Sequence, residues 1–202
     1  MPPTIVLQFK VALREVEPQV WRRFQTPAGY SFWDLHVAIQ DAMGWQDSHL
    51  HEFRVKKSRG RKVWKIGIPD DETEDTLAGW VEPVYSYFKM PGDVTEYVYD
   101  FGDYWQHELV LEGLLLAEPG TRYPRCLAGA RACPPEDCGG PHGYQEMLKV
   151  LGDPGHDEYE DYVTWLGGQV AGNRPFDAGL FDATAVIFEN PRKRFRYAFD
   201  PD

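Results

Sequence analysis

Three short polar segments of this chain carry side chains whose types and spacing are suited to chemistry. The first, TEYVYDFGDYWQHELVLEG, is predicted to be a hairpin closed at Gly102-Asp103. Asp100, Asp103 and His107 would lie around that turn, and carboxylates beside an imidazole suit acid–base catalysis or metal binding. The structural alternative is a core face, on which aromatic rings such as Trp105 surround one hydrogen-bonded histidine.

The second segment, RCLAGARACPPEDCGGPHGY, contains three cysteines and a histidine. Together they make the Cys3His set that tetrahedral zinc accepts, formed by Cys126, Cys133, Cys138 and His142. Their spacing differs from that of zinc fingers and ribbons, whose ligands come in closely spaced pairs. The alternative is that the cysteines are buried structural thiols.

The same segment offers a different site through its carboxylates. Glu136 and Asp137 precede Gly139-Gly140, which is expected to open a helix. Carboxylates suit the positive end of a helix, and the bare N–H groups there could equally hold an anion. The structural alternative is an extended Pro-Pro piece and a glycine turn that packs the helices on the sheet.

The third segment, SHLHEF, has two histidines at a spacing of two residues. On a predicted strand from His49 to Val55, the imidazoles of His49 and His51 would point to one face and could chelate a metal. Two hydrogen-bonded histidines without a metal are the alternative.

A basic stretch gives a further hypothesis, that of nucleic-acid binding. The segment from Arg54 to Lys65 carries seven bases and Trp64, and the C-terminal segment 192–196 adds four more. Such residues suit phosphates and stacked bases. The net charge of −11 argues against broad affinity for nucleic acid or anionic membranes, and favours a protein or small-molecule ligand.

The elements that must position these residues follow from hydrophobic periodicity. Strands are expected at 5–13, 20–25, 49–55, 63–68, 85–89, 96–101 and 105–111. One helix should begin after Ser31 and end at Gly44, and three more should cover 144–151, 157–166 and 178–188. A last short strand or a docked tail is expected at 195–199. Strands dominate the first half and helices the second, so the pattern predicts an α+β fold with a mostly antiparallel sheet.

Composition sets the remaining bounds. The 202 residues are 43% hydrophobic and 14% aromatic, which predicts one folded domain over residues 1–202, since no flexible linker interrupts them. Three cysteines do not suggest a disulfide framework. No signal peptide or membrane span is visible, so cytoplasmic localisation is expected.

The chain also resembles a known family. The runs VWRRFQTPAGYSFWDLHVAIQDAMGWQDSHLHEF, YVYDFGDYWQHELVLE and CLAGARACPPEDCGGPHGY, with the weaker FDAGLFDATAVIFEN, are similar to the plasmid pRiA4b open-reading-frame-three-like family. The resemblance implies an α+β protein of unknown function, found on plasmids and mobile elements. The residue at Cys138 varies in that family's pattern, which weakens a zinc site there. The resemblance instead implies a polar set of Asp100, Asp103, Trp105, His107, Glu136, Asp137, Gly139 and Gly140.

A structural explanation of these carboxylates competes with a functional one. Buried carboxylates need partners, and Arg22, Arg23 and Arg131 could supply them in an ion-pair network. In sequence, such a network and a reactive site look the same.

Three functions remain open at this point. The first is a binding or adaptor domain with a groove lined by Trp45, His49, His51, Tyr99, Trp105 and His107. The second is a hydrolase that uses a divalent metal as cofactor and the residues Asp100, Asp103, His107, Glu136 and Asp137. The third is a nucleic-acid accessory factor that uses the basic hairpin.

Overall fold

Alternating apolar side chains build the centre of the sheet. In the computed structural model, which describes residues 4–56, 62–69, 75–169 and 176–200, the strand β1 covers Ile5–Leu13. Its side chains at Leu7, Phe9 and Val11 are fully buried. Because successive side chains of a strand point to opposite faces, this spacing directs one face into the core.

Eight strands form a single sheet in the order β5-β4-β3-β6-β7-β1-β2-β8. Neighbouring strands are antiparallel except for β4 and β5, which are parallel. The longest pairing is between β1 and β7, with Ile5 opposite Leu116 and Leu13 opposite His107. The other strands are β2 (Trp21–Pro27), β3 (His51–Lys56), β4 (Val63–Gly67), β5 (Thr76–Ala78), β6 (Val94–Tyr99), β7 (Trp105–Leu116) and β8 (Arg125–Ala130).

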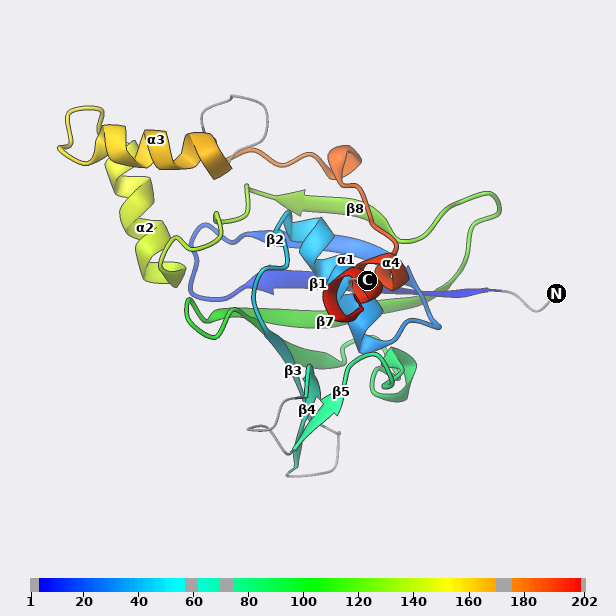
Figure 1. Ribbon diagram of the computed structural model, residues 1–202. Coiled ribbons are helices and arrows are strands. Elements are labelled where there is room, and N and C mark those ends of the chain that lie inside the picture. The colour runs from blue at the N-terminus through cyan, green and yellow to red at the C-terminus, as the bar shows by residue number, and fades with distance from the viewer. Residues whose placement is uncertain (1–3, 57–61, 70–74, 170–175, 201–202) are drawn as a thin grey trace.

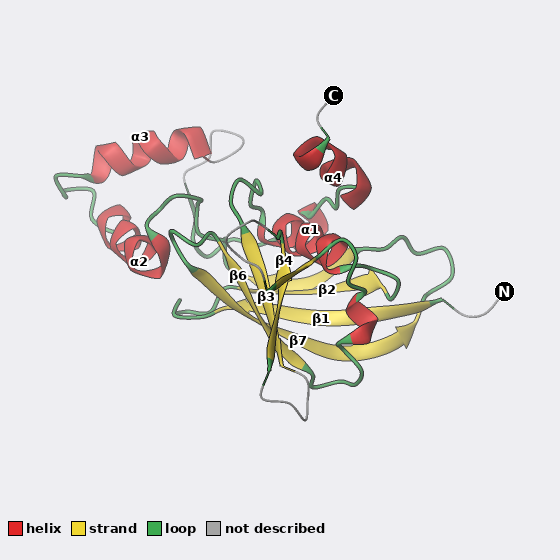
Figure 2. Cartoon of the chain, turned by 60° about the horizontal axis from the view of Figure 1, so that its bottom comes forward, coloured by secondary structure: helices red, strands yellow, loops and turns green. Residues whose placement is uncertain are grey.

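The helices lie over one face and one end of this sheet (Figures 1 and 2). Helix α1 packs on the sheet and α4 lies against α1, while α2 and α3 contact each other at one end. Their bounds are α1 (Phe32–Met43), α2 (Gly140–Leu151), α3 (Tyr159–Gln169) and α4 (Pro191–Phe199), with 3-10 turns η1 (Val84–Ser86) and η2 (Ala183–Ala185). Within the described ranges, no helix is long and apolar enough to cross a membrane.

Helix α1 begins and ends where its sequence predicts. Ser31 is the N-cap: its hydroxyl accepts the N–H of Asp34, and the Asp34 carboxylate accepts the N–H of Ser31. This reciprocal pair is a capping box, which satisfies two donors that the first turn leaves without partners. Gly44, with φ at +96°, closes the other end.

The expected α+β class, the mostly antiparallel sheet and the early helix are confirmed, and several boundaries are corrected. The segment 85–89 is not a strand, because it begins inside the 3-10 turn η1 and continues as a turn and a loop. The segment 178–188 contains only η2, and 195–199 belongs to helix α4 rather than to a strand. Two strands, β5 and β8, were not expected.

One boundary bears directly on the candidate site. Strand β3 begins at His51, so His49 lies in the loop between α1 and β3 and not on the strand. The backbone of Asp47 in that loop has φ at +62°, a left-handed conformation that strands do not adopt. His49 and His51 consequently have different surroundings.

Candidate functional site

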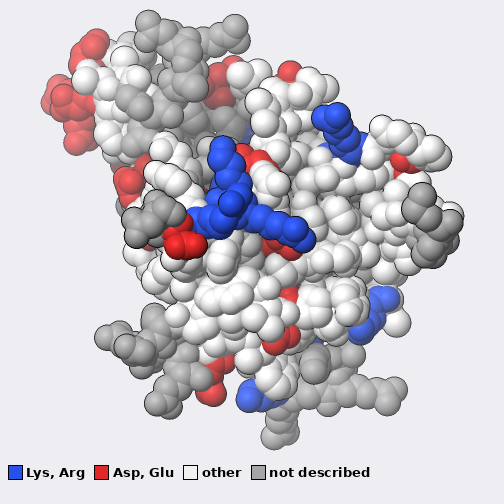
Figure 3. Space-filling view, turned by 45° about the vertical axis from the view of Figure 1, so that its right-hand side comes forward, with Lys and Arg blue, Asp and Glu red and all other residues white. Residues whose placement is uncertain are grey.

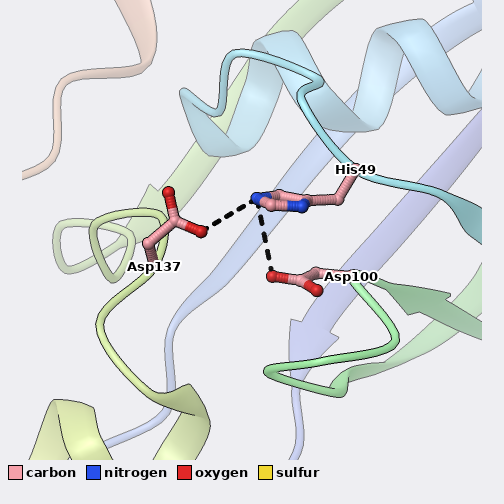
Figure 4. A group of neighbouring side chains, drawn as sticks. All are labelled: His49, Asp100 and Asp137. Carbon is pink, nitrogen blue, oxygen red and sulfur yellow. Dashed lines mark ion pairs between the residues drawn. The ribbon is translucent and has the colours of Figure 1, made fainter.

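A histidine and two aspartates from three separate loops meet at one place (Figure 4). Nε2 of His49 lies 3.0 Å from Oδ1 of Asp137 and 3.6 Å from Oδ2 of Asp100. One ligand atom from each residue lies within 4.8 Å of the other two. Imidazole nitrogen and carboxylate oxygen are both ligands for divalent cations, so small side-chain rotations would place all three around one ion.

The backbone aims both carboxylates at His49. Asp100 follows β6 directly, and Asp137 lies in the loop between β8 and α2, opposite the loop that carries His49. Asp100 and Asp137 have φ angles of +55° and +59°, in the left-handed region that L-residues other than glycine seldom occupy. Such conformations cost roughly 1–3 kcal/mol each and concentrate at functional sites.

Glu136 holds the surrounding loops together rather than facing the same space. Its Oε1 accepts a 2.5 Å hydrogen bond from the hydroxyl of Tyr99 and a 3.2 Å bond from the N–H of Gln46. The Tyr99 hydroxyl in turn accepts the N–H of Ser48, next to His49. Burial, together with the bond to Glu136, raises the pKa of Tyr99, so this hydroxyl stays protonated as a donor.

Asp103 and the two glycines join the turns that carry Asp100 and Asp137. The N–H of Gly139 donates to Oδ2 of Asp103 over 3.1 Å. Gly140 has φ at +68°, and a Cβ there would collide with the carbonyl oxygen of Asp103. Gly140 is therefore required for the close approach of the two turns.

The carboxylates of this region are not neutralised by the arginines that the sequence suggests. Arg22 is buried and donates to the carbonyl oxygens of Trp21, Ala42 and Ala130, while Arg23 pairs with Glu112 over 2.6 Å. Arg131 is half-buried and its Nε has no hydrogen-bond partner among the described residues. Within those residues, the basic side chain that lies within 4 Å of Asp100 and Asp137 is that of His49.

Several residues predicted to line a groove lie in the core, which corrects that expectation. Trp45, Tyr99, Trp105 and His107 are all nearly or fully buried and pack against one another. His51 is also buried, with its ring stacked 3.4 Å from that of His36. Because strand alternation places Tyr97, Tyr99, Trp105 and His107 on the helix-covered face, they cannot form an open groove.

His107 is accordingly separated from the aspartates with which it was grouped. Its Nδ1 lies 3.2 Å from the carbonyl oxygen of Tyr97 and 3.1 Å from that of Trp105. Burial lowers the pKa of His107 to about 4, so the ring is neutral at physiological pH. It is a core histidine, as the structural alternative proposed.

The expected Cys3His set does not come together. Cys126 lies on β8 with its Sγ 3.6 Å from the carbonyl oxygen of Arg23. Burial raises the pKa values of Cys133 and Cys138, that of Cys138 to about 12, so both are protonated thiols. His142 is exposed on α2, and across the described ranges only His49, Asp100 and Asp137 form a cluster of three or more such ligands.

Sequence reasoning identified the members of the cluster but not their grouping. Asp100 and Asp137 were placed in one carboxylate set, and His49 was paired with His51 on a strand. The sequence signal that could have distinguished His49 from His51 is the polar run Gln46-Asp47-Ser48, which is typical of a loop that continues up to His49.

The fold and this cluster define a single-domain α+β protein with a candidate metal site at the end of an antiparallel sheet. Residues 5–185 match the model of the plasmid pRiA4b ORF-3-like protein family, and the chain belongs to that family.

Two relatives extend over most of the chain. The uncharacterized protein y4hQ of Sinorhizobium fredii (strain NBRC 101917 / NGR234) is 38% identical over 164 residues, which are 80% of this chain and 81% of that protein. The crystal structure of MM3350 from Methanosarcina mazei Go1, described as a protein of unknown function, is similar with a TM-score of 0.81 and 42% identity. That similarity covers 92% of this chain and 99% of MM3350.

Proposed function

We propose that this protein binds one divalent metal ion through His49, Asp100 and Asp137, and uses it for hydrolysis. The observation that carries the proposal is the 4.8 Å cluster of three ligand atoms from segments far apart in sequence. The site holds two carboxylates and one imidazole, and among the described residues no lysine or arginine pairs with either carboxylate. Such a group of ligands attracts a cation.

The chemistry follows from the number of ligands and from their exposure. Three protein ligands leave coordination positions open, which is the pattern of catalytic rather than structural metal sites. The Asp137 side chain is 63% exposed, so water and a substrate can reach the ion. When bound, the metal would supply Lewis-acid activation of a water molecule, and Asp100, Asp137 and His49 would hold it in place.

Support for the other two functions is weaker. The binding or adaptor hypothesis depended on a groove whose expected lining is buried, with the exception of the partly exposed His49. The nucleic-acid hypothesis depended on the hairpin from Arg54 to Lys65, of which Lys57, Arg59 and Arg61 lie outside the described residues. Arg54 itself is engaged by Glu52 and Glu96.

The first test is metal binding by untagged protein purified without chelator. Isothermal titration with Mn²⁺ and Zn²⁺ should give one site per chain, which His49→Ala and Asp100→Asn should each abolish. Two substitutions serve as matched controls: His142→Ala removes an exposed histidine, and Asp103→Asn keeps an acceptor for the Gly139 N–H. Binding that survives both ligand substitutions would contradict the proposed site.

The second test addresses hydrolysis separately. Metal-loaded protein should cleave an activated phosphodiester or ester, such as bis(p-nitrophenyl) phosphate or p-nitrophenyl acetate, and the Asp100→Asn variant should not. Metal binding without cleavage of either probe would support the site and reject hydrolysis of these two ester classes.

A further inference from the structure

A hollow beside α4 combines aromatic rings with two arginines. It has a volume of about 700 Å³ and is lined chiefly by Trp33, Asp34, Trp80, Arg192, Phe195 and Arg196. This volume falls within the range of roughly 300–1,000 Å³ that is typical of small-molecule sites. None of these residues belongs to the proposed metal site, so the hollow is a separate feature.

The aromatic wall of the hollow is fixed in position. Trp33 is 4% exposed, and its indole N–H donates to the carbonyl oxygen of Pro191 over 3.0 Å, which ties α1 to α4. The Phe195 ring lies 5.6 Å from that of Trp33 and 5.5 Å from that of Trp80. Trp80 is 37% exposed, so part of its ring remains available to stack on a planar group.

The arginines of the hollow have their charge available. Arg192 and Arg196 are four residues apart on α4, so their side chains lie on the same side of the helix. In the described part of the chain, α4 forms its ion pairs through Arg194, with Asp41, Asp47 and Glu189, and neither Arg192 nor Arg196 has a carboxylate within ion-pair distance.

The lining of the hollow carries two positive side chains and one negative side chain. The one acid in the lining, Asp34, uses its Oδ2 to accept the N–H and hydroxyl of Ser31. Figure 3 shows a group of basic side chains near the middle of one face, with acidic side chains beside it and uncharged ones over much of the remaining surface. In a chain of net charge −11, a local pair of free guanidinium groups selects for an anionic ligand.

We propose that this hollow binds a nucleotide, with the base against Trp80 and Phe195 and the phosphate between Arg192 and Arg196. Guanidinium groups present forked N–H donors that match phosphate oxygens, and two of them balance the charge of about −2 on a terminal phosphate. The planar base accounts for the exposed indole, which phosphate alone would not require. Such a nucleotide could be free or a unit of a single strand, because both present a planar base and an anionic phosphate, although the diester of a strand carries only one negative charge.

Isothermal titration tests the proposal with AMP, adenosine, inorganic phosphate and a short oligodeoxythymidylate. AMP should bind more tightly than either adenosine or phosphate. Arg192→Gln with Arg196→Gln should weaken AMP binding by about tenfold or more, the loss expected for charge-assisted bonds. Trp80→Leu should weaken AMP and adenosine but not phosphate. The matched control is Lys193→Gln, which removes an exposed base from the same helix without touching the hollow.

The outcomes distinguish a free nucleotide from a nucleic-acid strand, and both from non-specific attraction of anions to basic side chains. Binding of AMP that depends on both arginines supports a free nucleotide, and binding of the oligonucleotide alone with the same dependence supports a strand. Equal affinity for phosphate and AMP, or equal loss in Lys193→Gln, would overturn the proposal. Absence of binding by every ligand at millimolar concentration, with the circular dichroism spectrum unchanged, would also overturn it.

Discussion

At the scale of single residues, the hydroxyl of Tyr99 connects loops that the sequence keeps far apart. It donates to Glu136 and accepts from the N–H of Ser48, and so fixes the positions of both Asp137 and His49. Tyr99→Phe should weaken metal binding by about 10–100-fold, the usual effect of removing a group that orients a ligand. Titration with Mn²⁺ measures this, with Tyr197→Phe, which removes an exposed hydroxyl, as the control.

An unchanged metal affinity in the Tyr99→Phe variant would mean that the loops hold their shape without the hydroxyl. Unfolding by urea should be measured beside it, because Glu136 would be left buried with one bond fewer, at a cost of about 1–3 kcal/mol. A loss of stability without a loss of affinity would make Tyr99 a residue of the fold alone.

Gly140 offers a second test at this scale. Gly140→Ala forces a Cβ against the carbonyl oxygen of Asp103 at a backbone angle of +68°. We expect a loss of roughly 2 kcal/mol or more in the free energy of unfolding, and weaker metal binding, because the two turns must separate. Gly167→Ala, where a Cβ meets nothing on α3, should be neutral or slightly stabilising in the same urea titration.

At the scale of elements, helix α4 is held on α1 by one arginine as well as by its aromatic side chains. Arg194 lies 2.7 Å from Asp41 and 3.0 Å from Glu189, and the side chain of Asp41 is only 5% exposed. Arg194→Gln leaves that carboxylate without its cation and should cost about 2–3 kcal/mol. Hydrogen exchange of residues 191–199 should rise more than that of the sheet, since α4 can detach locally. Lys193→Gln is the control, and uniform protection in both variants would contradict this role.

At the scale of the whole molecule, two buried histidines make stability depend on pH. Burial lowers the pKa of His107 to about 4 and lowers that of His51 well below its usual value. Near pH 6.5 the unfolded chain binds protons at these rings but the folded chain does not. The contribution of the two neutral rings to the free energy of unfolding is therefore fully present above pH 6.5 and is lost as the pH falls below it. His107 alone should account for roughly 3 kcal/mol by pH 4.

The relevant window is pH 6.5 to 4.5. The pKa of Glu112 is lowered chiefly by its bond with Arg23, so its contribution to the free energy of unfolding is lost only when the pH falls below this range. Asp41, whose pKa is raised by burial, acts in the opposite direction and reduces the fall. Urea unfolding at pH 7.5, 6.5, 5.5 and 4.5 measures the net slope, and a flat profile would contradict the neutral buried histidines.

Local sequence signals predicted much of this fold, and long-range arrangement accounts for what they missed. The alternation in β1 and the Ser31 cap are encoded within a few residues, and both were predicted correctly. Strand β8 was missed because RCLAGA has small residues and a glycine that predict a loop; it becomes a strand by pairing with β2. Pairing with a distant strand overrides weak local propensity.

The candidate site was predictable in its residue types but not in its grouping. Asp100 stood out because it follows an apolar strand at the predicted turn, and Asp137 because it precedes the Gly139-Gly140 pair that was expected to open a helix. His107 is excluded because its side chain lies on the buried face of β7, and His49 is included because β3 begins two residues after it and leaves it in a loop. A shift of one residue exchanges the two faces of a strand, so such errors follow directly from uncertain boundaries.

The position of β1 in the sheet bears on how the chain acquires its structure during synthesis. β1 is the first strand, yet it lies between β2 and β7, and its partner Leu116 lies past the middle of the sequence. During synthesis on the ribosome, the hairpin of β1 and β2 can form early, but the other edge of β1 cannot be paired until β7 has emerged. Folding should therefore be slow and governed by a late, long-range closure, with an unpaired edge exposed to chaperones or aggregation in the meantime.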